Sequence, residues 1–108
     1  MRRFESLHRQ ADFARLRRLG RRASTKSLII YRSALLPSDR SSLVGITVSK
    51  SIGKAVIRNK VRRRLAAIVQ EALARRQAMR LLVVARPPAS ETAYTDLRAE
   101  VTSALGEG

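Results

Sequence analysis

The spacing of apolar side chains predicts a short helix near the start of the chain. Phe13, Leu16 and Leu19 recur at intervals of three over residues 10–19, which is typical of an amphipathic helix, and Gly20 is well placed to end it. Arginines occupy the other faces of this segment. We therefore expect one side of the helix to pack on a core while the other sides stay basic.

Two strands are predicted next. Residues 27–35 are rich in β-branched and aromatic side chains, so they favour a strand, and Tyr31 falls on one of its faces. Residues 42–49 alternate between apolar and polar positions, which predicts a half-buried strand with Thr47 on the polar side. Residues 37–41 between them contain proline, serine and aspartate and predict a hairpin-type loop.

A long amphipathic helix is predicted after Gly53. At about 100° per residue, its apolar positions form one narrow stripe as far as about Arg76, which makes a helix of about 20 residues. This stripe can dock on a sheet. It consists of Ile57, Val61, Leu65, Ile68 and Ala72.

The C-terminal third predicts one more strand and one more helix. Residues 79–85 are a continuous apolar run, typical of a strand that is buried on both faces and has a parallel neighbour. Ser90 or Thr92 can cap a final helix. The apolar stripe of that helix consists of Tyr94, Leu97, Val101 and Ala104 or Leu105.

Together these elements predict a single α+β domain over residues 1–108, in the order α-β-β-(β)-α-β-α, where the bracketed strand would arise from a split near residue 40. We expect a two-layer sandwich with helices on one side of the sheet and the other face partly open. Residues 21–26 are predicted to be a polar connector. Residues 1–9 are predicted to be mobile or loosely docked, and residues 106–108 to be mobile.

The charge of the chain indicates a polyanionic partner. Its 108 residues suit one domain and include 23 Lys and Arg against eight Asp and Glu, a formal net charge of +15. Such self-repulsion is relieved by an anion, and nucleic acid is the usual one. Cysteine is absent, which removes disulfide and thiolate chemistry. We find neither a secretory signal nor an apolar run near the ~20 residues that span a bilayer, so we expect a cytoplasmic protein without membrane contact.

Catalysis by the polypeptide is not indicated. His8 is the only histidine, and the eight carboxylates are scattered, with no pair at helix or strand spacing that suggests acid–base chemistry or a metal site. No glycine-rich phosphate motif occurs. We therefore predict no catalytic residue, no protein metal site and no small-molecule cofactor.

The most informative stretch is residues 48–65, VSKSIGKAVIRNKVRRRL. It contains seven of the basic residues and no acid, and it passes from a strand through Gly53 into the long helix. Lys and Arg at phosphates release condensed counterions, and arginine adds forked hydrogen bonds. Asn59 supplies an amide that can donate and accept. A solvated basic face and a membrane-surface helix are the alternatives; seven cations without an acid repel one another, and the apolar side lacks Trp and Phe.

A second candidate surface is the polar side of the strands. Tyr31, Thr47 and Ser49 share it, and Phe13 is a candidate to turn toward it. Aromatic rings beside arginines on an open sheet form a stacking platform for single-stranded RNA, although plain sheet packing explains Tyr31 equally well.

These segments resemble a known family. VGITVSKSIGKAVIRNKVRRRL, with ARPPAS about twenty residues later and ADFARLRRLG near the N-terminus, is similar to the protein subunit of bacterial ribonuclease P over residues 4–105. The resemblance implies a protein cofactor of a ribozyme that removes the 5′ leader of precursor tRNA. It also implies two RNA partners, the ribonuclease P RNA and precursor tRNA, together with Mg²⁺ that is bound mainly by RNA. In addition, it implies a left-handed β-α-β crossover, against the general right-handed rule.

The resemblance also assigns residues. The arginine-asparagine-arginine motif of the family corresponds to Arg58-Asn59-Lys60, and the leader cleft would run past Ser51 at its rim. Lys60, Ser51 and Arg17 depart from the family pattern, Arg17 by replacing a second aromatic of the first helix. The expected contacts to the catalytic RNA are Lys50, Lys54, Arg58, Asn59, Lys60, Arg62, Arg63 and Arg64. The expected leader cleft consists of Phe13, Arg17, Tyr31, Thr47 and Ser51.

Two other classes of function remain open from the residues alone. A structural RNA-binding protein of ribosomal type would use the same basic helix and small α+β domain. A protein-only nuclease would need the carboxylate cluster that the sequence lacks.

Overall fold

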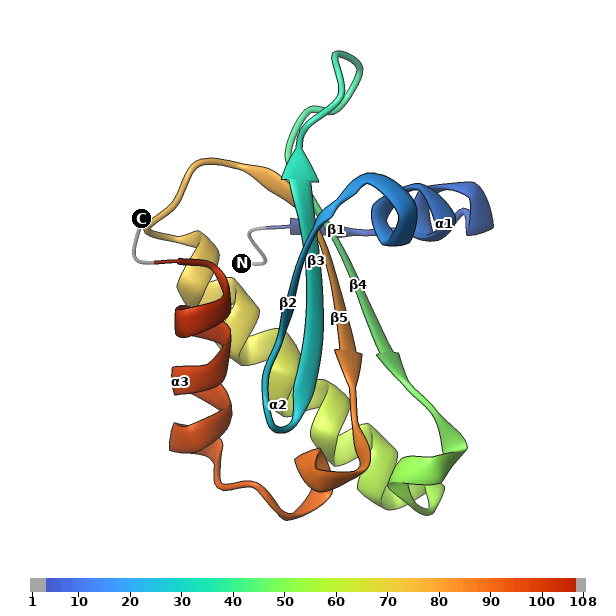
Figure 1. Ribbon diagram of the computed structural model, residues 1–108, viewed down its shortest axis with the longest axis vertical. Helices are drawn as coiled ribbons and strands as arrows, with labels where there is room; N and C mark the ends of the chain where they lie inside the picture. Colours follow the sequence, from blue (N-terminus) through green and yellow to red (C-terminus); the bar gives the residue numbers. More distant parts are fainter. Residues whose placement is uncertain (1–3, 107–108) are drawn as a thin grey trace.

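The chain folds around one five-stranded sheet, as shown by a computed structural model that describes residues 4–106 (Figure 1). The strand order across the sheet is β1-β4-β5-β3-β2. The prediction that residues 1–3 and 107–108 are mobile lies outside the described residues. Along the chain the elements are β1 (Phe4–Ser6), α1 (Gln10–Leu19), β2 (Arg21–Ser24), β3 (Leu28–Ala34), β4 (Ser42–Val48), the short 3₁₀ helix η1 (Lys50–Ile52), α2 (Ala55–Leu73), β5 (Met79–Ala85), the 3₁₀ helix η2 (Pro87–Glu91) and α3 (Tyr94–Ala104).

The sheet is mixed. β4 lies parallel to β1 and to β5, whereas β3 lies antiparallel to β5 and to β2. In Figure 1, β4 and β5 point the same way, α2 runs behind the sheet, and β5 lies to the left of β4, so the crossover is left-handed. The predicted α+β class and the crossover implied by the family resemblance are both confirmed.

The larger core lies between one face of the sheet and the helices α2 and α3. Alternation along β3 and β5 sends every second side chain to this face, and the helices meet it with their apolar stripes. The stripe of α2 is confirmed from Val61 onward, but Ile57 remains 40% exposed. The largest fully buried side chains of this core are Leu28, Ile30, Leu65, Ile68, Val69, Leu81, Val83, Leu97, Val101 and Leu105.

A smaller apolar cluster lies on the opposite face, beneath α1. Leu16 and Leu82 are buried there together with Leu7, and Phe13 and Tyr31 pack against them while half-buried. Leu19, the last residue of the predicted stripe, is 60% exposed. Helix α1 thus lies on the face that we expected to be partly open, and it covers only one end of that face (Figure 1).

The start of the chain is more ordered than its sequence predicts. Residues Phe4–Ser6 form an edge strand beside β4, and Phe4 and Leu7 are buried. Residues 4–7 of this segment are thus docked on the sheet, and the mobility of residues 1–9 stays a prediction. A three-residue strand is too short to show a period.

Two predictions about connections are also wrong. The polar residues Arg21–Ser24 form the edge strand β2 instead of a connector. The loop at 37–41 does not close a hairpin, because β5 lies between β3 and β4 in the sheet. No additional strand forms at residue 40, where the described chain is a turn and loop.

The predicted cap of the last helix is also wrong. Helix α3 begins at Tyr94 with Ala93 as its N-cap and no side-chain cap bond. The Thr92 hydroxyl donates to the Pro88 carbonyl at 2.7 Å, and the Ser90 hydroxyl donates to the Pro87 carbonyl, so both serve η2. Tyr94, predicted to be core, is 37% exposed.

Candidate nucleic-acid interface

The basic stretch turns at Gly53 and then starts α2. Gly53 has a φ of 148°, a conformation that residues with a side chain rarely adopt, and a Cβ added there would lie 3.2 Å from the Ile57 Cδ1. The helix then starts at Ala55 with Lys54 as its N-cap, no side-chain cap bond and no acid in its first turn. Its free N–H groups and the positive end of its dipole therefore add to the local positive charge. This end of α2 attracts anions.

The cations of α2 point away from the core. Asn59, Lys60 and Arg63 are exposed, whereas Val61 and Leu65 of the same turns are buried. Arg62 is exposed and donates from Nη1 to the Asn59 Oδ1 at 3.1 Å, which fixes the amide oxygen. Four of the predicted RNA-contact residues, Asn59, Lys60, Arg62 and Arg63, therefore lie exposed on the outward side of α2. Lys50 and Lys54 lie exposed at its start, and Arg64 is half-buried at its flank.

Arg58 differs from its neighbours. It is half-buried, and its Nε is buried with no hydrogen-bond partner among the described residues. Buried guanidinium groups normally have acceptors, because an unsatisfied donor costs free energy. Because this nitrogen is shielded from solvent, an RNA phosphate can contact it only if the Arg58 side chain moves.

The uncovered part of the sheet forms the second surface. Thr47 of β4, Val84 of β5 and Ile29 of β3 lie side by side on the face that carries α1, and each is half-buried. Tyr31 shares this face nearer α1 and opposes Leu82. Figure 1 shows that α1 does not extend over the other end of this face. An apolar, partly exposed sheet face with an aromatic ring can stack unpaired bases.

The Phe13 ring packs against Gly45, where the absence of a Cβ leaves room for it. A Cβ added to Gly45 would lie 2.6 Å from the Phe13 Cε1 and 3.0 Å from its Cζ, so the ring rests directly on the β4 backbone. Beside it is a groove of about 200 Å³ lined by Phe13, Gly45, Ile46, Arg62 and Ala66, among others. The groove exists because β1 pairs only with the first half of β4. It brings the ring of α1 and the arginine of α2 to one place.

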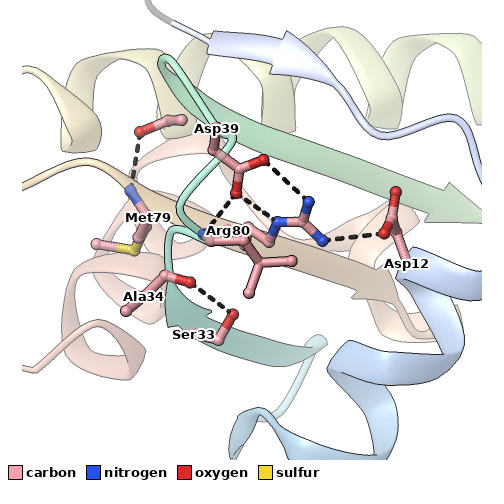
Figure 2. Close-up of polar contacts among 8 residues, drawn as sticks. Asp12, Ser33, Ala34, Asp39, Met79 and Arg80 are labelled. Carbon is pink, nitrogen blue, oxygen red and sulfur yellow. Dashed lines mark hydrogen bonds and ion pairs between the residues drawn. The ribbon is translucent and has the colours of Figure 1, made fainter.

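A buried ion-pair network holds α1 over the sheet (Figure 2). Arg80 of β5 is 6% exposed and donates to both carboxylate oxygens of Asp39, from Nε at 2.8 Å and from Nη2 at 3.0 Å. Its Nη1 donates to the Asp12 Oδ1 at 3.0 Å. Because Asp12 precedes Phe13, this contact fixes the height and rotation of α1 beside the groove.

The network also shifts two pKa values. The hydrogen bonds from Arg80, followed by the bond that the Leu36 N–H donates to Oδ2 at 2.7 Å, lower the pKa of Asp39. The bond to Asp39 raises the pKa of Arg80 despite its burial. Both groups therefore stay charged at neutral pH, and the network acts as a permanent clamp. Sequence reasoning missed it, although an arginine at the start of an otherwise apolar strand was a signal that a buried partner is required.

The remaining residues of the predicted leader cleft, Arg17 and Ser51, lie at the margins of the open sheet face. Arg17 is exposed in the last turn of α1. Ser51 is exposed in η1, and its hydroxyl lies 2.7 Å from that of Ser49. Within residues 4–106, no group of three or more His, Cys, Asp or Glu could hold a metal ion. None of the helices in that range is long and apolar enough to cross a membrane.

Comparison with known proteins decides the family. The ribonuclease P family model matches residues 1–107. The chain belongs to the ribonuclease P protein family. It is thus a protein component of an endoribonuclease holoenzyme that processes tRNA, and it works with an RNA subunit.

Individual ribonuclease P proteins are similar to this chain along most of their length. The ribonuclease P protein component of Acidothermus cellulolyticus is 36% identical over 101 residues, which cover 93% of this chain and 84% of that protein. The component of Thermobifida fusca is 38% identical over 108 residues, covering 92% and 72%. The Staphylococcus aureus RNase P protein structure superposes with a TM-score of 0.82 at 25% identity, covering 93% and 91%.

Proposed function

We propose that this ribonuclease P protein binds the catalytic RNA through α2 and the 5′ leader of precursor tRNA across the open sheet face, and so aids Mg²⁺-dependent removal of the leader in the cytoplasm. The observation that carries the proposal is the groove shared by Phe13 and Arg62. It joins the outward basic surface of α2 to the sheet face. One protein can therefore contact both RNAs at adjoining surfaces.

The α2 surface suits a folded RNA. Its exposed cations can pair with phosphates along a helix of 19 residues, about 28 Å long, without reading sequence. The uncapped N-terminus of α2 favours phosphate oxygens at its start. The expected contacts remain Lys50, Lys54, Arg58, Asn59, Lys60, Arg62, Arg63 and Arg64.

The sheet face suits a single strand. Tyr31 and Phe13 offer rings on which unpaired bases can stack, and Thr47 offers a hydroxyl between them and η1. Arg17 and Ser51 at the margins would contact the backbone of the leader. A double-stranded stem cannot splay its bases onto these rings, so this surface should prefer the leader to the mature tRNA.

Among residues 4–106, no group of three or more His, Cys, Asp or Glu could hold a metal ion, and Asp12 and Asp39 are paired with Arg80. We propose that Mg²⁺ is bound mainly by the RNA. The role of the protein is to hold and align the two RNAs. Lys and Arg beside the phosphates also lower the counterion demand of assembly.

Reconstitution tests this proposal. Cleavage of precursor tRNA by a ribonuclease P RNA is measured across a Mg²⁺ series with and without the protein. We expect the protein to lower the Mg²⁺ concentration that gives half-maximal cleavage. An unchanged Mg²⁺ dependence and an unchanged rate at low Mg²⁺ would refute the proposal. Cleavage by the protein without RNA would instead support a protein nuclease.

A further inference from the structure

Strand β2 widens the open sheet face beyond the predicted leader cleft. Its residues pair with β3 in a register that places Arg22 opposite Tyr31 and Arg21 opposite Arg32. Because side chains alternate along a strand, Arg22 lies on the face of Tyr31 and of α1, whereas Arg21 lies on the other face. The two neighbouring arginines therefore serve different surfaces.

Arg22 and Tyr31 form a pair with unused polar groups. Directly opposed residues in an antiparallel pair have Cβ atoms about 4.5–5.5 Å apart, so one ligand can touch both side chains. Arg22 is exposed and Tyr31 half-buried, and neither the guanidinium nor the phenol hydroxyl has a hydrogen-bond partner within the described range 4–106. Each is free to bind a group from outside the chain.

The other face of β2 is occupied differently. Arg32 donates from Nη1 to the Leu105 carbonyl at the end of α3, and Arg21 and Arg32 line a separate groove with Leu35 and Met79. Within residues 4–106, the residue opposite Arg21 on that face is Arg32 and not an aromatic one. The pairing of an aromatic ring with a free arginine is thus specific to the Arg22 face.

We propose that Arg22 and Tyr31 form a nucleotide-binding site that extends the track for single-stranded RNA to the far edge of the sheet. The Tyr31 ring stacks on an unpaired base, and the Arg22 guanidinium binds the adjacent phosphate. This inference rests on the proposed function, since it lengthens the leader-binding face. It assigns a binding residue to a segment that the sequence predicts to be a connector.

The position of the site indicates which part of the leader it binds. From β4 to β2 the face crosses three strand spacings of about 4.8 Å, so Arg22 lies roughly 14 Å across the sheet from Thr47. A short leader held at Phe13 and Thr47 ends before it reaches β2. A longer leader continues to Arg22. The contribution of Arg22 should therefore depend on leader length.

The chain supplies a matched control for the test. Arg22→Ala and Arg21→Ala remove the same charge from adjacent exposed positions of one strand, on opposite faces. Each variant is assembled with a ribonuclease P RNA, and the affinity of the holoenzyme is measured for precursor tRNAs whose leaders are lengthened one nucleotide at a time. We expect Arg22→Ala to weaken binding of long leaders about 3- to 10-fold and to lower the salt slope by about one, with short leaders unaffected.

Three results are decisive. Equal effects of Arg21→Ala and Arg22→Ala, or a loss that is independent of leader length, would overturn the site and indicate general charge attraction. A wild-type holoenzyme that binds precursor and mature tRNA equally would refute the proposed function itself. Retention of most long-leader affinity by Arg22→Lys, which keeps the charge, together with its loss in Arg22→Gln, would support the phosphate contact.

Discussion

Gly45→Ala tests how α1 is held against the sheet. Gly45 is buried in β4, and a Cβ there would lie 2.6 Å and 3.0 Å from two carbons of the Phe13 ring. Carbon atoms in ordinary contact are about 3.5–4.0 Å apart, so the ring must retreat by roughly 1 Å. Helix α1 cannot simply rise with it, because Asp12 is bound to the buried Arg80.

The cost follows from overpacking. Inserting one methyl group into a site that cannot relax destabilises a protein by about 1–3 kcal/mol. For a domain of this size, each 1 kcal/mol lowers Tm by roughly 4–8 °C. We expect Gly45→Ala to lower the free energy of unfolding by about 1–3 kcal/mol and to lower Tm in proportion. Leader binding should weaken, because the ring is displaced from the groove. The affinity for the catalytic RNA should not change.

A double-mutant cycle isolates the contact. Unfolding is followed by thermal or urea denaturation for wild type, Gly45→Ala, Phe13→Ala and the double variant. In the Phe13→Ala background the added methyl group meets no ring, so Gly45→Ala should cost little there. If Gly45→Ala destabilises both backgrounds equally, the ring does not rest on this glycine and the geometry of the groove is wrong.

Two further predictions concern charge. Arg62→Ala should lower the slope of log affinity against log salt for the catalytic RNA by about one. Arg75 is exposed beyond the end of α2, so Arg75→Ala should leave this slope unchanged. Equal slopes for wild type and Arg62→Ala would show that Arg62 does not contact a phosphate. Because the pKa of Asp39 is lowered, its charge stabilises the fold above its unfolded pKa of about 3.9, and this stability is lost as the pH falls through the lower folded value. Asp39→Asn should therefore lower Tm at pH 7, and its Tm should approach that of wild type below about pH 4. Glu91→Gln, at an exposed position, serves as the control. A Tm difference between Asp39→Asn and wild type that stays constant from about pH 7 to about pH 2 would contradict the clamp.

Local patterns predicted most of the elements. The helix at 10–19 and the strand at 79–85 have the predicted bounds, because each carries a clear period or a long apolar run. Strand β2 has four residues, three of them polar, so its extended form comes from pairing with β3 and leaves little trace in its own sequence. The insertion of β5 between β3 and β4 is likewise a long-range event that no local pattern records.

The candidate site was predictable in its residues more than in its geometry. The basic residues of 50–64 predicted an anion-binding helix, which stays a prediction, and the buried stripe from Val61 places the exposed cations of α2 on its outer side. The clamp was not predictable, because Asp12 and Arg80 are 68 residues apart and only the fold brings them together. The contact between the Phe13 ring and Gly45 also forms only when the fold brings α1 onto β4.

The central claim is that one face of this protein recognises the single-stranded leader while α2 holds the catalytic RNA. The most direct test compares the affinity of the reconstituted holoenzyme for precursor tRNA and for mature tRNA at constant salt and Mg²⁺, and repeats the comparison with the RNA alone. Since stacking contributes about 1–3 kcal/mol per base, we predict that the protein makes precursor binding tighter by roughly tenfold or more relative to mature tRNA. Equal affinities for the two RNAs in the presence of the protein would contradict the account.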